Sequence, residues 1–318
     1  NSGGANACTG PEGLDDTRRT AEHLAETLEI SAHDVLVCST GLIGERLPMQ
    51  TLLAGITDGV PRLAAGTEPD AAAARAIMTT DTIPKTAERT TDSGVRVGGI
   101  AKGAGMLAPQ LATMLVVLTT DADIDADTAD AVLREATATT FDRVDSDACM
   151  STNDTVILMA SGASDVTPEV RELTEAVRAV SADLARQLVA DAEGASHDVH
   201  VVVRSATTEA AALAVAREIA RSNLVKAAIF GNDPNWGRIV AAAGCVPETL
   251  APFAVEDLSV RVNGVEVCRA GGAHRDRSEV DMTPREILIE VDLGAGDATG
   301  DIWTNDLTHD YVEENSAY

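Results

Sequence analysis

Apolar positions recur along this chain with two different periods, one helical and one extended. Apolar residues three or four apart predict helices over residues 16–28, 71–78, 128–140, 168–192 and 209–222. Short apolar runs rich in β-branched residues predict strands over residues 34–40, 94–102, 114–120, 154–161, 197–206 and 224–230. Helices and strands are therefore expected to alternate irregularly over this part of the chain.

Beyond residue 257 the pattern is mainly extended. Residues 258–270 carry the pair Asn263-Gly264 between two alternating runs, which is typical of a β-hairpin turn. Further strands are predicted over residues 286–294 and 300–312. The whole pattern predicts a mixed α/β (α+β) fold with antiparallel pieces, because it lacks the regular strand–helix–strand order of a doubly wound sheet.

Length and charge narrow the function classes. With 318 residues the chain is long enough for one large domain or two ordinary ones. It has no run of 18 apolar residues, and its first ten residues lack the basic and apolar regions of a signal peptide. The formal net charge of −27 repels phosphate backbones and anionic lipids, so neither nucleic acid nor membrane is expected as a partner.

Cysteine, histidine and lysine usage adds three expectations. Five scattered cysteines without a C-x-x-C pair predict reduced thiols in a cytoplasmic protein. The six histidines show no metal-ligand spacing, and the acidic run at residues 121–130 lacks the glycine and glutamate of a calcium loop, so no metal is predicted. Only Lys85, Lys102 and Lys226 are lysines among 24 basic residues, which fits either a high-salt cytoplasm or a GC-rich genome.

One residue in the apolar run at residues 106–118 raises a chemical question. Thr113 follows the small Ala112 there, and it is either a buried filler or a nucleophile. A threonine hydroxyl needs a base, and its own α-amine serves as one once the preceding peptide bond is cut. The hydroxyl could make that cut by attacking the carbonyl of Ala112. Residue types alone favour the ordinary buried threonine.

The segment around Thr113 resembles a known self-cleavage site. Its sequence, GGIAKGAGMLAPQLATMLVVLTTDA, is similar to that of the bifunctional ornithine acetyltransferase / N-acetylglutamate synthase family of arginine biosynthesis. Six other blocks resemble that family in the same order, namely NSGGANACTG, VCSTGLIGERLP, IMTTDTIPK, STNDT, FGNDPNWGR and YVEENSAY. The resemblance covers nearly the whole chain, and it implies the family's N-terminal-nucleophile-like fold.

The resemblance also implies roles for individual residues. Thr113 matches the nucleophile, and a cut between Ala112 and Thr113 gives an α piece, residues 1–112, and a β piece, residues 113–318. Thr40 and Gly41 match the pair that forms the oxyanion hole. Besides Thr113, the residues that match substrate contacts are Thr79 and Thr80, between which the pattern does not choose, Lys102, Glu193 and Asn315. Lys102 suits a substrate carboxylate, and Glu193 suits the amine of ornithine.

The implied reaction is acetyl transfer through an acetyl-threonine. Thr113 takes the acetyl group of N2-acetyl-L-ornithine, ornithine leaves, and L-glutamate accepts the group as N-acetyl-L-glutamate, with no cofactor. Some family members also use acetyl-CoA as a co-substrate, and the sequence does not decide whether this chain does. The two pieces are expected to stay associated, as a heterotetramer in the cytoplasm.

Two other interpretations stay open on the sequence. One is a self-cleaving amidase or aminopeptidase, in which water replaces glutamate. The other is an uncleaved, non-catalytic homologue that binds a small molecule. The family pattern normally has a segment before NSGGANA and residues after NSAY, so both ends are expected to be incomplete, with the N-terminal part of the α piece missing.

Overall fold

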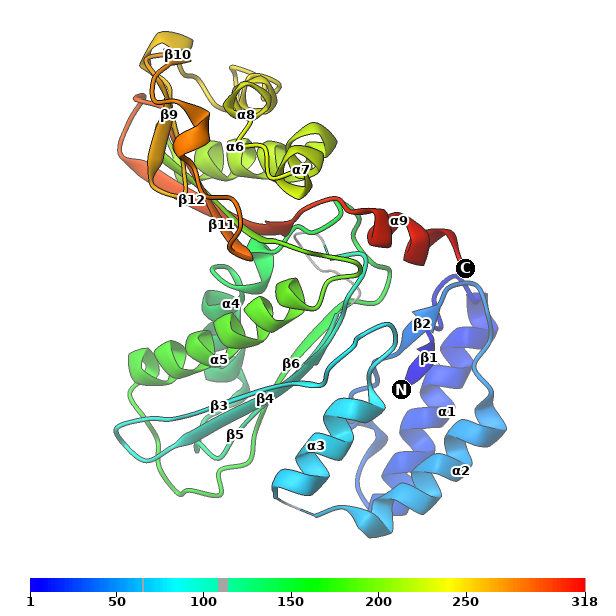
Figure 1. The fold of residues 1–318 in the computed structure, drawn as a ribbon. Coiled ribbons are helices and arrows are strands. Elements are labelled where there is room, and N and C mark those ends of the chain that lie inside the picture. Colours follow the sequence, from blue (N-terminus) through cyan, green and yellow to red (C-terminus); the bar gives the residue numbers. More distant parts are fainter. Residues whose placement is uncertain (65, 108–113, 318) are drawn as a thin grey trace. The chain divides into compact units, whose positions relative to one another are not determined.

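The computed structural model describes residues 1–64, 66–107 and 114–317, and they form two compact units (Figure 1). Unit 1 comprises Asn1–Ala104, Gln110–Thr139 and Met150–Leu184. Unit 2 comprises Gly105–Pro109, Thr140–Cys149 and Ala185–Tyr318. No helix in the described part of the chain is long and apolar enough to cross a membrane.

A four-stranded sheet forms the centre of unit 1 (Figure 1). Its strands, in spatial order, are β3 (Lys85–Thr90), β4 (Arg96–Lys102), β5 (Leu115–Thr120) and β6 (Thr155–Ala160). β4 is antiparallel to both β3 and β5, whereas β5 and β6 are parallel. The strands predicted at 94–102, 114–120 and 154–161 are confirmed, and β5 has the buried side chains that its apolar run predicts.

Five helices and a short two-stranded sheet complete the regular structure described in unit 1. They are α1 (Gly10–Leu28), α2 (Met49–Gly59), α3 (Thr67–Ala76), α4 (Ala126–Thr137), α5 (Val170–Ala190) as far as Leu184, β1 (Ser2–Gly4) and β2 (Thr40–Leu42), with short 3-10 turns at Ala32–Asp34 and Val60–Arg62. α5 packs on the large sheet, where Val180 and Leu184 lie against Gly99 of β4. Helices α1 and α2 lie side by side (Figure 1).

Unit 2 is built on a six-stranded sheet with the order β10-β9-β8-β11-β7-β12. The strands are β7 (Asp198–Ala206), β8 (Ser259–Val262), β9 (Val265–Arg269), β10 (Gly272–Ala273), β11 (Glu286–Asp292) and β12 (Ala298–Asn305). Helix α6 (Glu209–Arg221) packs on β7 and β12, and α7 (Asn223–Phe230) and α8 (Trp236–Ala243) pack beside it. Short 3-10 turns lie at Phe141–Arg143, Val255–Asp257 and Arg277–Glu279. The core is aliphatic, with alternate residues of β7 and β11 fully buried.

All five predicted helices are present, and the predicted hairpin is confirmed. The largest difference in a helix boundary is at α1, which begins at Gly10 rather than residue 16. Pro11 sits in its first turn, where proline is tolerated because that N–H has no partner within the helix. Asn263 and Gly264 have φ angles of 46° and 81°, the left-handed values that a type I′ turn requires.

Two predicted strands are wrong, and a third is half right. Residues 34–40 reach a strand only at Thr40, because the available partner is the three-residue β1. Residues 224–230 form helix α7, which Ser222 caps and whose buried residues recur at helical spacing. The strand predicted over 300–312 ends at Asn305 and gives way to helix α9 (His309–Ser316).

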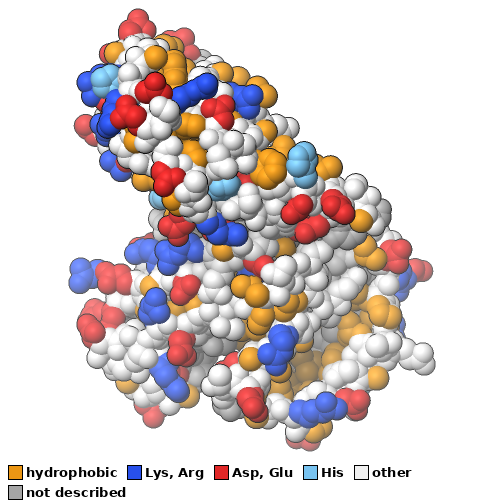
Figure 2. Space-filling model, in the orientation of Figure 1, with side chains coloured by type: hydrophobic (Ala, Val, Ile, Leu, Met, Phe, Trp, Pro, Cys, Tyr) orange, Lys and Arg blue, Asp and Glu red, His pale blue; other side chains and the backbone are white. Residues whose placement is uncertain are grey.

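Acidic and basic side chains are mixed on the face drawn in Figure 2. There, Asp and Glu side chains lie among Lys and Arg side chains over both units. Several exposed pairs are direct contacts, for example Arg134 with Asp130 at 2.7 Å and Arg178 with Glu135 at 2.7 Å. Exposed pairs of this kind stabilise a fold by at most about 1 kcal/mol each, so this charge serves solubility more than stability.

Candidate active site

Lys102, at the end of β4, lies at the centre of a polar cluster in unit 1. Its Nζ donates to the Thr79 Oγ1 at 2.7 Å and to the Thr40 Oγ1 at 3.3 Å. The Asp81 Oδ2 lies 3.7 Å away, and the lysine side chain is only 1% exposed. Three predicted site residues, Thr40, Thr79 and Lys102, are therefore brought together from three separate segments of the chain.

Asp81 fixes this cluster, and sequence reasoning missed it. Its Oδ1 accepts from the Lys85 Nζ at 2.7 Å and the Gly103 N–H at 2.6 Å, while its Oδ2 accepts from the Thr79 N–H at 3.0 Å. Burial raises the pKa of the Asp81 carboxyl, but Lys85 and Lys102 outweigh burial and bring that pKa below its ordinary value. The available signal was the Asp and Lys four residues apart in the IMTTDTIPK block.

Of the two threonines between which the sequence does not choose, Thr79 is the one that contacts Lys102. Thr80 is exposed beside it. A substrate contact by either residue stays a prediction.

The predicted oxyanion pair lies on β2. Gly41 has φ of 129°, and a Cβ added there would lie 2.3 Å from the carbonyl carbon of Gly3, so only glycine fits. A lysine ammonium has donors and no acceptor, so the contact with Lys102 uses the Thr40 oxygen as an acceptor. The hydroxyl hydrogen of Thr40 then remains for a second partner, which is what an oxyanion donor needs.

Ala112 and Thr113 lie outside the described residues, so the predicted cut and the predicted nucleophile stay predictions. Met114, the next residue along the chain, is described and buried. Its N–H donates to the Asp154 Oδ1 at 2.9 Å, and its carbonyl accepts from the Thr155 N–H at 3.0 Å. Sequence reasoning missed Asp154, although it lies within the STNDT block.

The register of the sheet places this segment beside the lysine cluster. Leu115 pairs with Lys102 on β4 and with Thr155 on β6. The strand that begins directly after residue 114 is therefore flanked by Lys102 on one side and by Asp154 and Thr155, at the start of β6, on the other.

Two further predicted residues meet within unit 2. Asn315, on α9, donates from its Nδ2 to the Glu193 Oε2 at 3.0 Å. The glutamate follows the end of α5, and a Cβ added at Gly105 would lie 2.6 Å from its Oε2, so a larger residue at position 105 would displace this carboxylate. Glu193 and Asn315 thus form one polar contact, as a shared substrate site requires.

A cavity of about 70 Å³ lies beside Glu193 in unit 2. Its lining includes Asp147 and Tyr311. Burial raises the pKa of the Asp147 carboxyl, and the Met106 N–H, which donates to its Oδ2 at 2.6 Å, lowers it. Burial, followed by the charges of Asp147 and Glu193, raises the pKa of the Tyr311 hydroxyl. Arg221 and Lys226 line the cavity as well, so only its acidic side, with Asp147 and Glu193, suits a cationic group such as an amine.

Lys226 also lines this cavity, but its ammonium is used by the protein itself. Its Nζ donates to the Ser146 carbonyl at 2.7 Å and the Thr304 Oγ1 at 3.1 Å, and also to the Asn305 carbonyl. Burial lowers the pKa of Lys226 to about 8, although Asp145 and two other nearby carboxylates oppose the shift. These bonds join α7 to the end of β12, so we assign Lys226 an architectural role.

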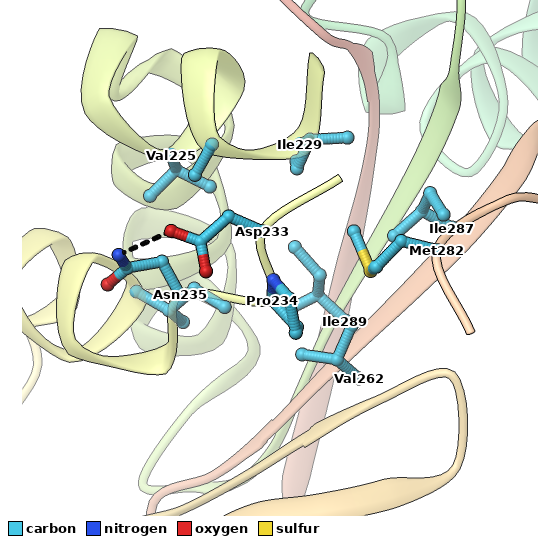
Figure 3. Close-up of a pocket in the computed structure, with 11 residues that line it drawn as sticks. Val225, Ile229, Asp233, Pro234, Asn235, Val262, Met282, Ile287 and Ile289 are labelled. Atoms are coloured by element: carbon cyan, nitrogen blue, oxygen red, sulfur yellow. Dashed lines mark hydrogen bonds between the residues drawn. The ribbon is translucent and has the colours of Figure 1, made fainter. Parts of the chain in front are cut away.

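The pocket drawn in Figure 3 is a packing gap rather than a substrate site. Its volume of about 10 Å³ is at the lower limit for a single water molecule, and mainly aliphatic side chains line it. Its polar pair, Asn235 and Asp233, is joined by a 2.9 Å hydrogen bond, and the Asn235 side chain also caps α8. The FGNDPNWGR block therefore supports the fold here. Across the described part of the chain, no group of three His, Cys, Asp or Glu side chains could hold a metal.

Comparison with known proteins identifies the family. A model of the ArgJ family matches residues 1–318. The chain belongs to the ArgJ family. It is 61% identical to the arginine biosynthesis bifunctional protein ArgJ of Streptomyces avermitilis, over all of this chain and 82% of that protein. It is 54% identical to the protein of the same name from Bifidobacterium longum, with the same coverage.

A solved ArgJ structure shares the fold. The crystal structure of the arginine biosynthesis bifunctional protein ArgJ from Bacillus halodurans is 33% identical, has a TM-score of 0.59, and matches 63% of this chain and 97% of that one. The resemblance that the sequence blocks indicate is thus confirmed for family and fold. The chain is a bifunctional acetyltransferase of arginine biosynthesis.

Proposed function

We propose that this ArgJ family member moves an acetyl group from N2-acetyl-L-ornithine to L-glutamate through an acetyl ester on Thr113. L-Ornithine and N-acetyl-L-glutamate are the products, and acetyl-CoA is a second acetyl donor to glutamate in the bifunctional cycle. The observation that carries the proposal is that Lys102 donates hydrogen bonds to Thr40 and Thr79. Lys102 lies on β4, which pairs with β5, the strand that begins shortly after Thr113.

Maturation comes first in the proposed sequence of steps. The Thr113 hydroxyl attacks the Ala112 carbonyl, the Ala112–Thr113 amide bond breaks, and water hydrolyses the resulting ester. The cut leaves a free α-amine on Thr113, with an ordinary pKa of about 7.7 to 8. This amine is the base that the hydroxyl lacks before the cut.

The acyl steps then follow. As the Thr113 Oγ bonds to the acetyl carbon, its proton moves to the α-amine and negative charge develops on the acetyl oxygen. The Thr40 hydroxyl and the Gly41 N–H stabilise that oxygen, and such donors contribute about 3 kcal/mol each. The C–N bond breaks as the amine proton passes to the leaving nitrogen of ornithine. Glutamate reverses these steps through its own amine.

Substrate charges set the remaining roles. Lys102 pairs with the carboxylate of the amino acid, and Thr79 or Thr80 lies beside it. Glu193, oriented by Asn315, pairs with the side-chain amine of ornithine, for which the acidic side of the cavity in unit 2 is chemically suited.

The two pieces of the cleaved chain are proposed to stay together in a heterotetramer. Strands on either side of the proposed cut, β4 and β5, are hydrogen-bonded neighbours in one sheet, which supports association of the pieces. We also propose a cytoplasmic location. All five cysteines lie in the described part of the chain as free thiols, three of them exposed, which fits a reducing compartment.

Intact mass under denaturing conditions tests the nucleophile. The parent protein should give two fragments divided between Ala112 and Thr113, and the Thr113→Ala variant should give one uncut chain. Product analysis with and without glutamate tests the acceptor, because the transferase makes N-acetylglutamate whereas an amidase releases acetate in both cases. A parent chain that stays whole while Thr113→Ala binds N-acetylornithine equally well would favour a non-catalytic binding protein.

A further inference from the structure

Asp154 is the carboxylate that contacts the chain next to the proposed nucleophile. Its Oδ1 accepts the Met114 N–H at 2.9 Å, although the two residues are 40 positions apart in sequence. The parallel pairing of β5 with β6 fixes this contact, because Leu115 and Thr155 are opposite each other and the Thr155 N–H binds the Met114 carbonyl at 3.0 Å. The contact is therefore set by the sheet.

The second carboxylate oxygen is available for another partner. Asp154 Oδ2 is buried, and among the residues that the structure describes it has no hydrogen-bond partner. A buried carboxylate oxygen without a donor is unfavourable, so such an atom in a folded protein calls for an explanation. A donor that exists only in the mature enzyme would provide one.

Cleavage would create such a donor on Thr113, one residue before Met114. Two bonded atoms separate the backbone nitrogen of residue 113 from that of Met114, so in any conformation the two nitrogens are less than about 4 Å apart. The Met114 nitrogen in turn is 2.9 Å from Asp154. Before cleavage the Thr113 nitrogen is an uncharged amide, and after cleavage it is an amine that takes up a proton.

We propose that Asp154 is a positioning residue that holds the α-ammonium group of Thr113 while Thr113 reacts. The proposal rests on the assignment of Thr113 as the nucleophile. As the Thr113 Oγ bonds to the acetyl carbon, its proton moves to the α-amine, and Asp154 stabilises the positive charge formed there. The same proton then passes to the ornithine nitrogen as its bond to the acetyl carbon breaks. Asp154 thus orients a base, as the third member of other catalytic triads does.

The surroundings of Asp154 leave it able to change charge near neutral pH. Burial raises its pKa to about 6, while the Met114 N–H and the charge of Lys102 oppose the shift. The nearby Ser151 N–H also opposes the shift, although it makes no hydrogen bond to Oδ2. Asp154 also lines a polar hollow of about 240 Å³ in unit 1, together with Cys38, whose thiol pKa is raised by burial. Because Lys102 is the charged group that acts on Asp154, Lys102 is left unchanged in the test.

The test is Asp154→Asn, whose side-chain carbonyl still accepts the Met114 N–H but carries no charge. Asp125→Asn is the matched control, since Asp125 also lies in unit 1 and accepts a backbone N–H, that of Thr128, at 2.8 Å. Intact mass comes first. The Asp154→Asn chain should still be cut between Ala112 and Thr113, because no ammonium group exists before cleavage. A parent that is cut and a variant that stays whole would overturn the inference while leaving the nucleophile assignment intact.

The deciding measurement is kcat/KM for N-acetylornithine against pH, which in a double-displacement reaction reports only the steps up to ornithine release. A nearby carboxylate raises the pKa of the amine, so Asp154→Asn should move the acid limb of the profile to lower pH by about 1 unit. It should also lower the plateau about 10- to 100-fold, which is less than the 10²–10⁴-fold that a general base itself contributes. Asp125→Asn should leave limb and plateau unchanged.

A lower plateau with an unmoved limb would mean that Asp154 only shapes the chain, and it would overturn the proposal. If Asp154→Asn does not fold, Asp154→Glu replaces it. That variant keeps the charge, so its limb should stay at the parent pH, and a limb displaced to lower pH would count against the proposal. A parent that is never cut removes the premise for both ideas, which distinguishes failure of the proposed function from failure of this inference.

Discussion

Unit 1 and unit 2 both bury lysine, but they satisfy it in different ways. In unit 1, Lys85 and Lys102 share the ionised Asp81, and the hydroxyls of two predicted site threonines also accept from Lys102. In unit 2, Lys226 instead donates to two backbone carbonyls and a hydroxyl. A lysine that an ionised carboxylate keeps protonated can bind a substrate anion. A lysine whose donors are used by backbone carbonyls stabilises the fold instead.

The contrast extends to the surface. All three lysines are buried, with exposures of 0%, 1% and 6%, while the exposed cations of the ion pairs are arginines. A lysine ammonium is compact and directs three donors to separate acceptors, whereas a guanidinium is planar and wider. In this chain lysine is therefore used where a small buried donor is needed, which is why each lysine merits a functional test.

The largest effect is expected from Lys102→Met. This change removes the proposed carboxylate partner and the donor that orients Thr40, so kcat/KM for N-acetylornithine should fall about 1,000-fold, or about 4 kcal/mol. Steady-state kinetics of the cleaved enzyme measure it. Arg96→Met, which removes an exposed cation from the same strand, should change the rate less than twofold. A loss below tenfold for Lys102→Met would place Lys102 in the same architectural class as Lys226.

Lys226→Met should act on stability instead. Without the ammonium, three buried acceptors lose a donor, and the free energy of unfolding should fall by about 3 kcal/mol. Activity of the folded variant should stay within about threefold of the parent, because the ammonium contacts only the protein itself. Urea unfolding and kinetics at low temperature separate the two effects. Arg134→Met, at an exposed pair, is the control and should cost less than about 1 kcal/mol.

Comparison with Lys226→Met also tests how the stability of the parent protein depends on pH. Burial lowers the pKa of folded Lys226 to about 8, from the ordinary lysine value of 10.5 that applies in the unfolded chain. Between these values the unfolded chain binds more protons, so folding is increasingly favoured as pH rises. The free energy of unfolding of the parent relative to Lys226→Met should therefore be level below pH 8 and rise from there to pH 10.5. A difference that stays constant across this window would contradict the lowered pKa of the buried Lys226.

The smallest effect is expected from Asn315→Ala. Asn315 contacts Glu193 through one hydrogen bond of 3.0 Å on an exposed helix, so its loss should raise KM for N-acetylornithine about fivefold, or about 1 kcal/mol, with kcat nearly unchanged. Ser316→Ala, next to it on α9, should leave both constants as they are. A drop in kcat as large as that of Lys102→Met would mean that Asn315 belongs with the reacting atoms.

Much of the fold followed from periodicity because long helices and buried strands have strong patterns. The errors have local causes. Residues 224–230 are a short apolar run, and such a run fits either a strand or a buried helix, so the cap at Ser222 decided the matter. Residues 34–40 have strand composition, but a strand needs a partner, and β1 offers one only from Thr40.

The residues of the site were likewise predicted only in part. The family blocks predicted Thr40, Thr79 and Lys102, and the structure brings these three together. They did not predict Asp81 or Asp154, because the importance of each lies in what it contacts. Asp154 meets Met114 only because two parallel strands align. A pattern along one chain does not contain that register.

The pairing of β4 with β5 has a consequence for assembly. Six residue pairs, from Val97 with Thr120 to Lys102 with Leu115, join strands that a cut between residues 112 and 113 would assign to different polypeptides. The uncut chain would fold as one polypeptide. After the cut, refolding would require two fragments to associate, because each fragment supplies half of one sheet. Unfolding of the mature protein would be a dissociation whose midpoint depends on protein concentration, whereas that of an uncut chain would not. Self-cleavage would in this way make the enzyme easy to form once and hard to re-form after dilution.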